Sequence, residues 1–210
     1  MSELPEFLYS ADQSREIDCL ALQIPNIQSG ELMRRAGEAA FRLLRSRWPK
    51  ARSIAVVCGP GNNGGDGYIV AALAAINGLK VHLLEVESPT TDDGRRARRD
   101  AEEANAVPKL YQPGDLPLVD IVVDAMLGTG LRRPPETRFS NAIVEINAIG
   151  LPVLSLDVPS GLDSDTGHIP SVAIKADATI SFICLKLGLF TGFGSAYCGQ
   201  VIFDSLDVSQ

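Results

Sequence analysis

The stretch "SIAVVCGPGNNGGDGYIVAALAAINGLKVHLLEVE", residues 53–87, decides the fold. An apolar run of strand length leads through a glycine-rich turn into an apolar helix, and a second strand-like run follows at residues 80–86. The glycines at positions 59, 61 and 64 fit the spacing G-x-G-x-x-G, which is typical of turns that hold a dinucleotide pyrophosphate at a helix N-terminus. The stretch therefore predicts one strand-helix-strand unit of a parallel sheet.

The same pattern continues along the chain. Two helices are expected before the first strand. One begins at residues 10–12, and the other covers residues 29–48. Further strands are expected at residues 53–58, 80–86, 119–124, 152–157 and 178–184, with helices at 66–77, 92–105 and 137–149 and an edge strand at 201–203. Near-continuous apolar runs such as "IVVDAML" are typical of strands buried on both faces. We expect one α/β domain over residues 1–210: a three-layer, doubly wound, Rossmann-like, mostly parallel sheet with N-terminal helices.

The composition excludes several classes of partner. The chain has 45% apolar residues and a formal net charge of -7, which disfavours nucleic acid and anionic membrane surfaces. The cluster "RRARR" at residues 95–99 is interpreted as a solvated helix face. The first residues lack a basic region followed by an apolar one, so secretion is not expected, and no apolar run approaches membrane-spanning length. The four cysteines are scattered without a metal-binding spacing. We expect a cytoplasmic protein with reduced, buried thiols and no zinc.

Ligands of open parallel sheets lie beyond the carboxyl ends of the strands. The segments that follow the first, third and fourth strands of the main pattern are "GPGNNGGDG", "DAMLGTGLRRP" and "DVPSGLDSDTG". Each carries glycine beside oxygen-bearing side chains. We expect the three to meet on one rim of the sheet.

The first of these loops departs from a plain dinucleotide turn. A carboxylate at Asp66 would repel a pyrophosphate unless it caps the helix, binds a hydroxyl or faces a cation. The adjacent amides Asn62 and Asn63 are also more polar than a tight turn requires. We therefore expect a wider loop than in a dehydrogenase. In the alternative interpretation Asp66 is an N-cap and the asparagines only form a turn.

The other two loops add phosphate-binding and carboxylate groups. Backbone amides of Gly128, Thr129 and Gly130, with Arg132 or Arg133 beside them, form a candidate phosphate cradle, although arginines are also common in plain surface loops. In the third loop, Pro159-Ser160-Gly161 predicts a sharp turn that holds Asp157 and Ser160 toward the rim. The following "DSDTG" is interpreted as a plain turn rather than a calcium loop.

Three hard oxygen donors follow neighbouring strands: Asn63, Asp124 and Ser160. If they converge, they suit an alkali or alkaline-earth ion rather than a transition metal. One carboxylate among three donors favours a weakly charged ion.

Taken together, these motifs resemble the NAD(P)H-hydrate epimerase family, the YjeF N-terminal domain type. The resemblance extends from "ELMRRAG" (residues 31–37) through the three loops above to "LGLFTG" (residues 187–192), in the order of the family. It implies an isomerase that interconverts the R and S forms of the hydrated cofactors NADHX and NADPHX. A separate or fused NAD(P)HX dehydratase would then restore the S form.

The resemblance also implies roles for individual residues. Substrate would contact Asn62, Asn63, Gly64, Gly65, Asp66, Gly128, Thr129, Gly130, Leu131, Arg132, Arg133, Pro134 and Asp157. A potassium ion would be held by Asn63, Asp124 and Ser160. Because epimerisation passes beside developing positive charge and needs proton transfer, a carboxylate suits the chemistry. We take Asp157 as the catalytic residue, with Asp66 and Asp124 as the other candidates.

Two other functions fit parts of the sequence. An NAD-dependent oxidoreductase would use the G-x-G-x-x-G turn and Glu85 for a ribose hydroxyl, but no His, Tyr or Lys relay stands out. A non-catalytic nucleotide-binding or scaffold module of the same fold is the other alternative, although such a protein has no need of the polar rim. Apolar residues Leu20, Leu22 and Ile24 fit either a homodimer contact or core packing.

Overall fold

The structure is a computed structural model that describes residues 4–24, 27, 30–131 and 133–208. Within these residues the main sheet has seven strands in the order β4-β3-β2-β5-β6-β7-β9, and every neighbouring pair is parallel. The strands are β2 (Ser53–Cys58), β3 (Lys80–Glu85), β4 (Pro108–Leu110), β5 (Ile121–Ala125), β6 (Val153–Leu156), β7 (Ala178–Phe182) and β9 (Gln200–Asp204). From β2 the chain winds outward to β4, then returns to β5 and winds outward to β9. The expected doubly wound sheet is confirmed.

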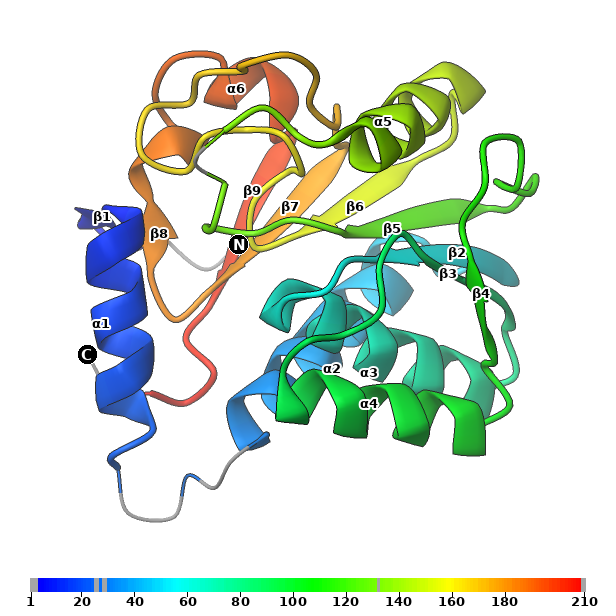
Figure 1. The fold of residues 1–210 in the computed structure, drawn as a ribbon. Helices are drawn as coiled ribbons and strands as arrows, with labels where there is room; N and C mark the ends of the chain where they lie inside the picture. The colour runs from blue at the N-terminus through cyan, green and yellow to red at the C-terminus, as the bar shows by residue number, and fades with distance from the viewer. Residues whose placement is uncertain (1–3, 25–26, 28–29, 132, 209–210) are drawn as a thin grey trace.

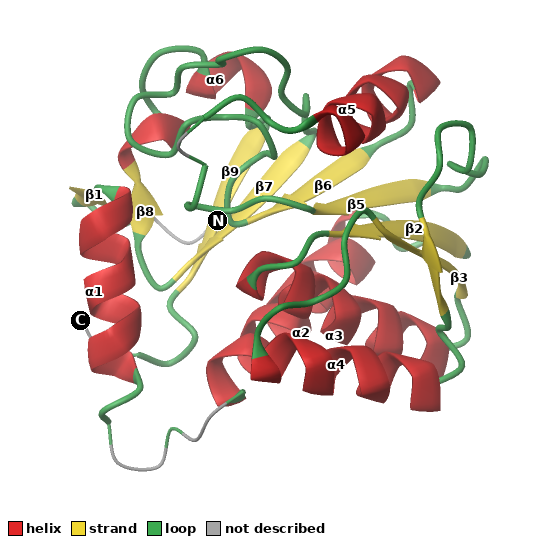
Figure 2. Ribbon diagram, in the orientation of Figure 1, coloured by secondary structure: helices red, strands yellow, loops and turns green. Residues whose placement is uncertain are grey.

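Helices cover both faces of this sheet, as Figures 1 and 2 show. The larger helical layer contains α2 (Glu31–Arg47), α3 (Asn62–Ile76) and α4 (Asp92–Glu103). The opposite face carries α5 (Thr137–Ile149) and the short helices η1 (Leu187–Leu189) and α6 (Gly194–Tyr197). The arrangement is the three-layer α/β architecture expected from the sequence.

Alternate residues of the central strands pack into two separate hydrophobic cores, one on each face of the sheet. On β2, Ile54 and Val56 pack against α2 and α3, whereas Ala55 and Val57 face the layer that contains α5. All four side chains are buried. Because strands buried on both faces need apolar side chains at every position, the sequence of β2 is continuously apolar.

The N-terminal helix α1 (Ala11–Ala21) lies beside the sheet rather than within the helical layers (Figure 1). Ser10 caps it in a capping box with Gln13. Just before it, β1 (Leu8–Tyr9) pairs in parallel with β8 (Leu185–Lys186). This small second ladder ties the start of the chain to the segment that follows β7.

Most of the predicted elements are confirmed, with shifts of a few residues at their ends. Strand β2 and helix α5 have the predicted bounds, and β9 is an edge strand of the main sheet. The predicted helix at residues 29–48 is observed at Glu31–Arg47, and Ser29 lies outside the described residues. The short strands β1, β4 and β8 were not expected from the sequence.

The start of α3 was predicted incorrectly. It begins at Asn62 after the N-cap Gly61, so that Asn62, Asn63 and Asp66 belong to the first turns of the helix. Only residues 59–61 separate β2 from α3, so the wide loop expected from the sequence is not observed. Asp66 is also not the N-cap.

The arginines of α4 and the cysteines agree with the sequence analysis except at Arg98 and Cys19. In α4, Arg95 and Arg96 pair with acidic residues on the same exposed helix face, but Arg98 reaches the buried carboxylate of Glu85. Cys58, Cys184 and Cys198 are buried free thiols, whereas Cys19 is exposed, contrary to expectation. In the described part of the chain, no helix combines the length and apolar composition that crossing a membrane requires.

Candidate functional site

A cavity of about 570 Å³ lies beyond the carboxyl ends of the central strands. Its wall includes residues that follow β2, β5, β6 and β7: Gly61, Gly128, Asp157 and Ile183. Strands β2 and β5 are neighbours from which the chain winds in opposite directions, the usual place for a ligand in such sheets. The cavity has the size of a small-molecule site. The three glycine-containing loops meet here, as the sequence predicts.

Glycines bring the loops after β2 and β5 into backbone contact. Gly59 donates from its N–H to the carbonyl of Ala125 at 3.1 Å, and a Cβ at Gly59 would lie 1.9 Å from the carbonyl oxygen of Met126. A Cβ at Gly64 would lie 1.9 Å from the carbonyl oxygen of Gly59. This close packing places the N-terminus of α3 at the cavity, where its free N–H groups and helix dipole favour an anion.

Asp66 projects from the second turn of α3 into the cavity. Burial raises the pKa of its carboxyl well above the ordinary value, and the nearby Asp157 and Asp18 raise it further. Both effects favour the neutral form of the carboxyl group. A neutral carboxylic acid donates a hydrogen bond and does not repel phosphate, which resolves the conflict that its position in the sequence poses.

Asp124 is the centre of a buried hydrogen-bond cluster. It is fully buried at the end of β5 and accepts from the hydroxyls of Ser160 at 2.5 Å and Ser155 at 2.9 Å, and from the N–H of Ser160 at 2.9 Å. Burial raises the pKa of Asp124, while the hydrogen bonds from Ser160 and Ser155 oppose the shift. The cluster fixes the turn after β6 against β5.

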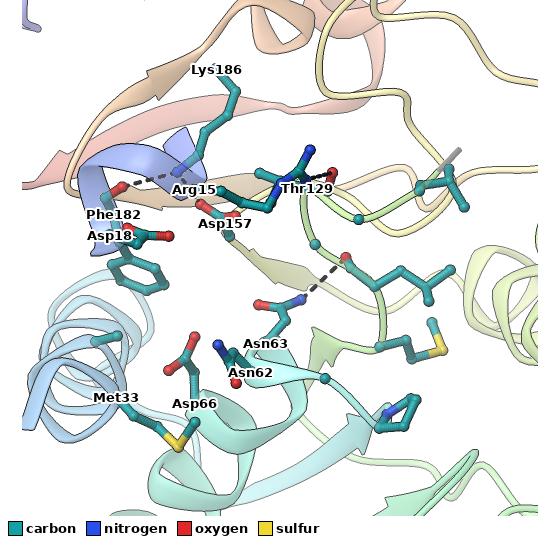
Figure 3. A pocket seen from close by; sticks show the side chains of 18 of the residues that line it. Arg15, Asp18, Met33, Asn62, Asn63, Asp66, Thr129, Asp157, Phe182 and Lys186 are labelled. Atoms are coloured by element: carbon teal, nitrogen blue, oxygen red, sulfur yellow. Dashed lines mark hydrogen bonds and ion pairs between the residues drawn. The ribbon is translucent and has the colours of Figure 1, made fainter. Parts of the chain in front are cut away.

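Asn63 joins this cluster through the loop after β5. Its amide Nδ2 donates to the carbonyl of Leu127 at 3.2 Å, the dashed line from Asn63 in Figure 3. The Ser160 hydroxyl oxygen lies 3.3 Å from the same carbonyl. Within the described part of the chain, Asn63 Oδ1 is buried without a hydrogen-bond partner. An unpartnered buried oxygen costs free energy unless an absent ligand satisfies it.

Asp157 forms an ion pair with the buried side chain of Lys186. The lysine ammonium donates to Asp157 Oδ1, to the carbonyl of Phe182 at 2.9 Å and to the hydroxyl of Ser181 at 3.3 Å. Burial lowers the pKa of Lys186, but attraction to Asp157, Cys184 and Asp18, together with the hydrogen bond to Asp157, raises the pKa above its ordinary value. All three N–H donors of the ammonium thus have acceptors, and its position is fixed.

The second oxygen of Asp157 faces the loop after β5. A Cβ placed on Gly128 would lie 3.5 Å from Asp157 Oδ2 and 3.5 Å from the Cβ of Asn63. Asp157 has a φ of 63°, and Ile183, next to Phe182, also has a φ of 63°. Such left-handed conformations are costly for residues other than glycine and are concentrated at functional sites. The backbone on both sides of the Asp157–Lys186 pair is therefore held in strained conformations.

The N-terminal helix contributes two further charged side chains to the cavity, Arg15 and Asp18. Burial raises the pKa of Asp18 to about 6, an effect that Lys186 opposes and Asp157 reinforces. Figure 3 shows the carboxyl groups of Asp18, Asp66 and Asp157 around the same hollow, with Lys186 above them. One wall of the cavity thus carries three carboxyl groups and one buried ammonium.

The predicted phosphate-binding loop forms a further part of the cavity wall. Gly128, Thr129, Gly130, Leu131, Arg133 and Pro134 all line it. Arg133 is exposed and pairs with Glu136 at 3.0 Å. Arg132 lies outside the described residues. Gly64 and Gly65 do not line the cavity: Gly64 packs on Gly59, and a Cβ on Gly65 would meet the side chain of Met33. Their role as substrate contacts stays a prediction.

Glu85 does not face the cavity as a ribose-binding acid would. It is buried and accepts hydrogen bonds from the Tyr68 hydroxyl at 2.8 Å and from Arg98 at 2.5 Å. The pairing fixes β3 against α3 and α4. Since its oxygens are already engaged, Glu85 gives no support to an NAD-dependent oxidoreductase.

Among the cavity residues that the sequence analysis missed are the charged side chains of Arg15, Asp18 and Lys186. Lys186 left a signal, because a lysine inside the apolar run "FICLKLGLF" must be paired if it is buried. No comparable sequence signal marks Arg15 and Asp18, because charged residues on an amphipathic helix usually face solvent.

Comparison with known proteins identifies relatives over nearly all of the chain. A family model described as YjeF-related protein N-terminus matches residues 29–188. The bifunctional NAD(P)H-hydrate repair enzyme Nnr of Coxiella burnetii is 44% identical over 205 residues, which cover 97% of this chain and 42% of that protein. The NAD(P)H-hydrate epimerase of Limosilactobacillus fermentum is 36% identical over 200 residues, which cover 95% and 96%. The chain spans less than half the length of the bifunctional relative.

The fold is also found in a solved structure. A yeast protein known from its crystal structure matches with a TM-score of 0.79 and 23% sequence identity, over 94% of this chain and 87% of the yeast chain. At this identity the match supports the fold alone. It agrees with the three-layer architecture described above.

Proposed function

The chain belongs to the family of YjeF-related protein N-termini, and from this we propose that it is an isomerase that interconverts the R and S forms of hydrated NADH and NADPH. The observation that carries the proposal is the meeting of Asn63, Gly128 and Asp157 in one cavity at the switch point of the sheet. We further propose that residues 1–210 act as a single epimerase domain.

The charges of the cavity suit this chemistry. Epimerisation at the hydroxylated ring carbon proceeds either through loss of the hydroxyl, which leaves a ring cation, or through opening and reclosure of the ring. Both routes develop positive charge and move a proton. Asp157, with Oδ1 held by Lys186 and Oδ2 toward Gly128, is a fixed carboxylate for the cationic ring. We assign it as the catalytic residue.

The remaining wall suits the rest of a dinucleotide. Backbone amides at the N-terminus of α3 and in the loop from Gly128 to Pro134 would bind the phosphates, with Arg133 at the mouth. Asn62, Asn63, Gly64, Gly65 and Asp66 belong to the same end of α3 and are proposed substrate contacts. Leu131 and Arg132 complete the proposed set.

The residues present fit a potassium ion. Asn63 Oδ1 is buried without a partner, and the Ser160 hydroxyl, the Asp124 carboxylate and the Leu127 carbonyl belong to the same hydrogen-bond cluster. Such a set of neutral oxygens with one carboxylate suits a weakly charged, hard cation. When bound, the ion would supply positive charge near the substrate and hold Asn63 and the turn at Ser160 in place.

Three further proposals concern the surroundings of the enzyme. An NAD(P)HX dehydratase is the proposed functional partner, as the names of the bifunctional relatives suggest. A homodimer is supported by the exposed apolar residues Leu20, Leu22 and Ile24, which are 55%, 51% and 37% exposed. The alternative that they pack in the core is wrong. We retain a cytoplasmic location as a proposal from the unpaired cysteines.

A coupled assay tests the function. The protein is added to mixed epimers of hydrated NADH together with a dehydratase specific for the S form, and the R form is followed. We expect the R form to disappear faster than with the dehydratase alone. A separate titration with undamaged NADH tests the oxidoreductase alternative, for which tight binding is expected. Unchanged loss of the R form would refute the epimerase assignment.

A further inference from the structure

The helix α1 is held against the candidate site by contacts before the helix, at its first residue and within it. Before the helix, Tyr9 pairs in register with Lys186. At its first residue, the N–H of Ala11 donates to Asp165 Oδ1 at 2.5 Å, in the segment that follows the Ser160 turn. Further along, Arg15 donates to the carbonyl of Thr129 at 3.5 Å, in the proposed phosphate loop. The position of α1 is thus set by the elements that form the cavity.

This placement brings Asp18 into the cavity wall, where it is half-buried. The charged and titratable groups that face it are Lys186, Asp157, Asp66 and the buried thiol of Cys184, while Arg15 of the same helix lines the same cavity. The three N–H donors of Lys186 are directed to Asp157, Ser181 and Phe182 rather than to Asp18, and the attraction of its charge does not outweigh the effect of burial on Asp18.

The carboxyl groups of the cavity therefore differ in their surroundings. Asp157 is the partner of a buried ammonium, and burial raises the pKa of Asp18 to about 6. Neighbouring acids whose environments separate them in this way commonly divide the work, one as the charged group and the other as the proton donor. Asp66 is not assigned this role, because it lies at the end of α3 where the phosphates are proposed to bind.

We propose that Asp18 is a second catalytic residue, which exchanges a proton with the departing and returning hydroxyl group while Asp157 faces the ring cation. The inference rests on the proposed epimerase function. As the carbon–oxygen bond breaks, both of its electrons stay on oxygen, the Asp18 proton is transferred to that oxygen, and water leaves. Water then adds to the opposite face of the ring carbon and returns a proton to Asp18. The enzyme is restored and only the configuration has changed.

Asp18 lies outside residues 29–188, the segment that the family model matches. The proposal therefore assigns a chemical role to the N-terminal helix rather than a purely structural one. It also explains why α1 is tied to Lys186, Thr129 and Asp165 by separate contacts. A proton donor has to be held at a fixed distance from the reacting atom.

The test compares Asp18→Asn with Glu16→Gln, an exposed acid on the same helix. Rates of R-to-S conversion are measured without dehydratase, after subtraction of the spontaneous rate. We expect kcat/KM to fall about 100-fold or more in Asp18→Asn, with KM little changed, and to be unaffected in Glu16→Gln. Asp18→Glu should recover part of the rate, because it keeps the carboxyl group.

A second readout does not depend on any variant. If protonated Asp18 is required, kcat/KM of the wild-type protein should fall as the pH rises through about 6. An Asp18→Asn protein as active as wild type, or a wild-type profile that is flat between about pH 5 and 8, would overturn the role of Asp18 and leave the epimerase assignment standing. An inactive wild-type protein would overturn both.

Discussion

Lys186 donates from its buried ammonium to Oδ1 of Asp157, although 29 positions separate the two residues in the chain. Lys186 belongs to β8, and Asp157 directly follows β6. The same ammonium also donates to the carbonyl of Phe182, which can only accept. This arrangement fixes one oxygen of the carboxylate and leaves the other toward the loop at Gly128.

The stability of this pair can be measured by a double-mutant cycle. Lys186→Met leaves Asp157 without its partner, and we expect a loss of about 3–5 kcal/mol in the free energy of unfolding in urea. Adding Asp157→Asn removes the unpaired charge, so the double variant should be more stable than Lys186→Met alone. Losses that simply add would show that the two groups are not coupled.

The contact between Gly59 and Gly64 predicts an unequal response to added methyl groups. Gly64→Ala would place a Cβ 1.9 Å from the carbonyl oxygen of Gly59, and neither backbone can move freely. We expect a loss of about 1–3 kcal/mol or more in unfolding free energy. Gly61→Ala is the control, because nothing lies within 4 Å of its Cβ position. Equal thermal unfolding of the two variants would contradict the described packing.

The cation site predicts a dependence of substrate affinity on potassium. Replacing potassium with tetramethylammonium at constant ionic strength should weaken binding of hydrated NADH in calorimetry, and Asn63→Leu should remove the difference between the two salts. The effect is expected to be about tenfold or more, as for other changes that loosen a metal site. Asn141→Ala, on an exposed position of α5, is the control. Equal affinity of the wild-type protein in both salts would refute the site.

Asp18 also predicts a pH-dependent stability. Its pKa is raised from 3.8 to about 6 in the folded protein, so the folded state binds its proton more tightly than the unfolded state does. The stability from this group is complete below pH 3.8 and is lost as the pH rises through about 6. Asp18→Asn should therefore be more stable than wild type at neutral pH, by up to about 3 kcal/mol, with no such gain near pH 4. A gain in urea unfolding that is equal at both pH values would contradict this.

Much of the fold was predictable because its central strands are buried on both faces. The continuous apolar runs of β2, β5 and β6 have few other interpretations, and their order along the chain sets the doubly wound topology. Short strands such as β4 and β8 carry too few residues for a periodic signal. They form because neighbouring backbone supplies hydrogen-bond partners, which depends on tertiary structure.

The parts of the candidate site formed by loop motifs were predictable from the sequence. The single charged residues Asp18 and Lys186 were not. Glycine has low helix propensity, so "NNGGDG" was interpreted as a loop. In the structure these glycines begin α3, because Gly64 and Gly65 allow close packing against Gly59 and Met33. The approach of Asp18 and Lys186 to Asp157 depends on how α1 and β8 pack, which no local pattern specifies.

The central claim is tested most directly by following the purified R epimer of hydrated NADH in potassium buffer by chromatography. We predict that the wild-type protein brings it to the equilibrium mixture with the S form much faster than buffer does. Asp157→Asn should slow this reaction by about 100-fold or more. Conversion by the wild-type protein at the rate of buffer alone would contradict the account.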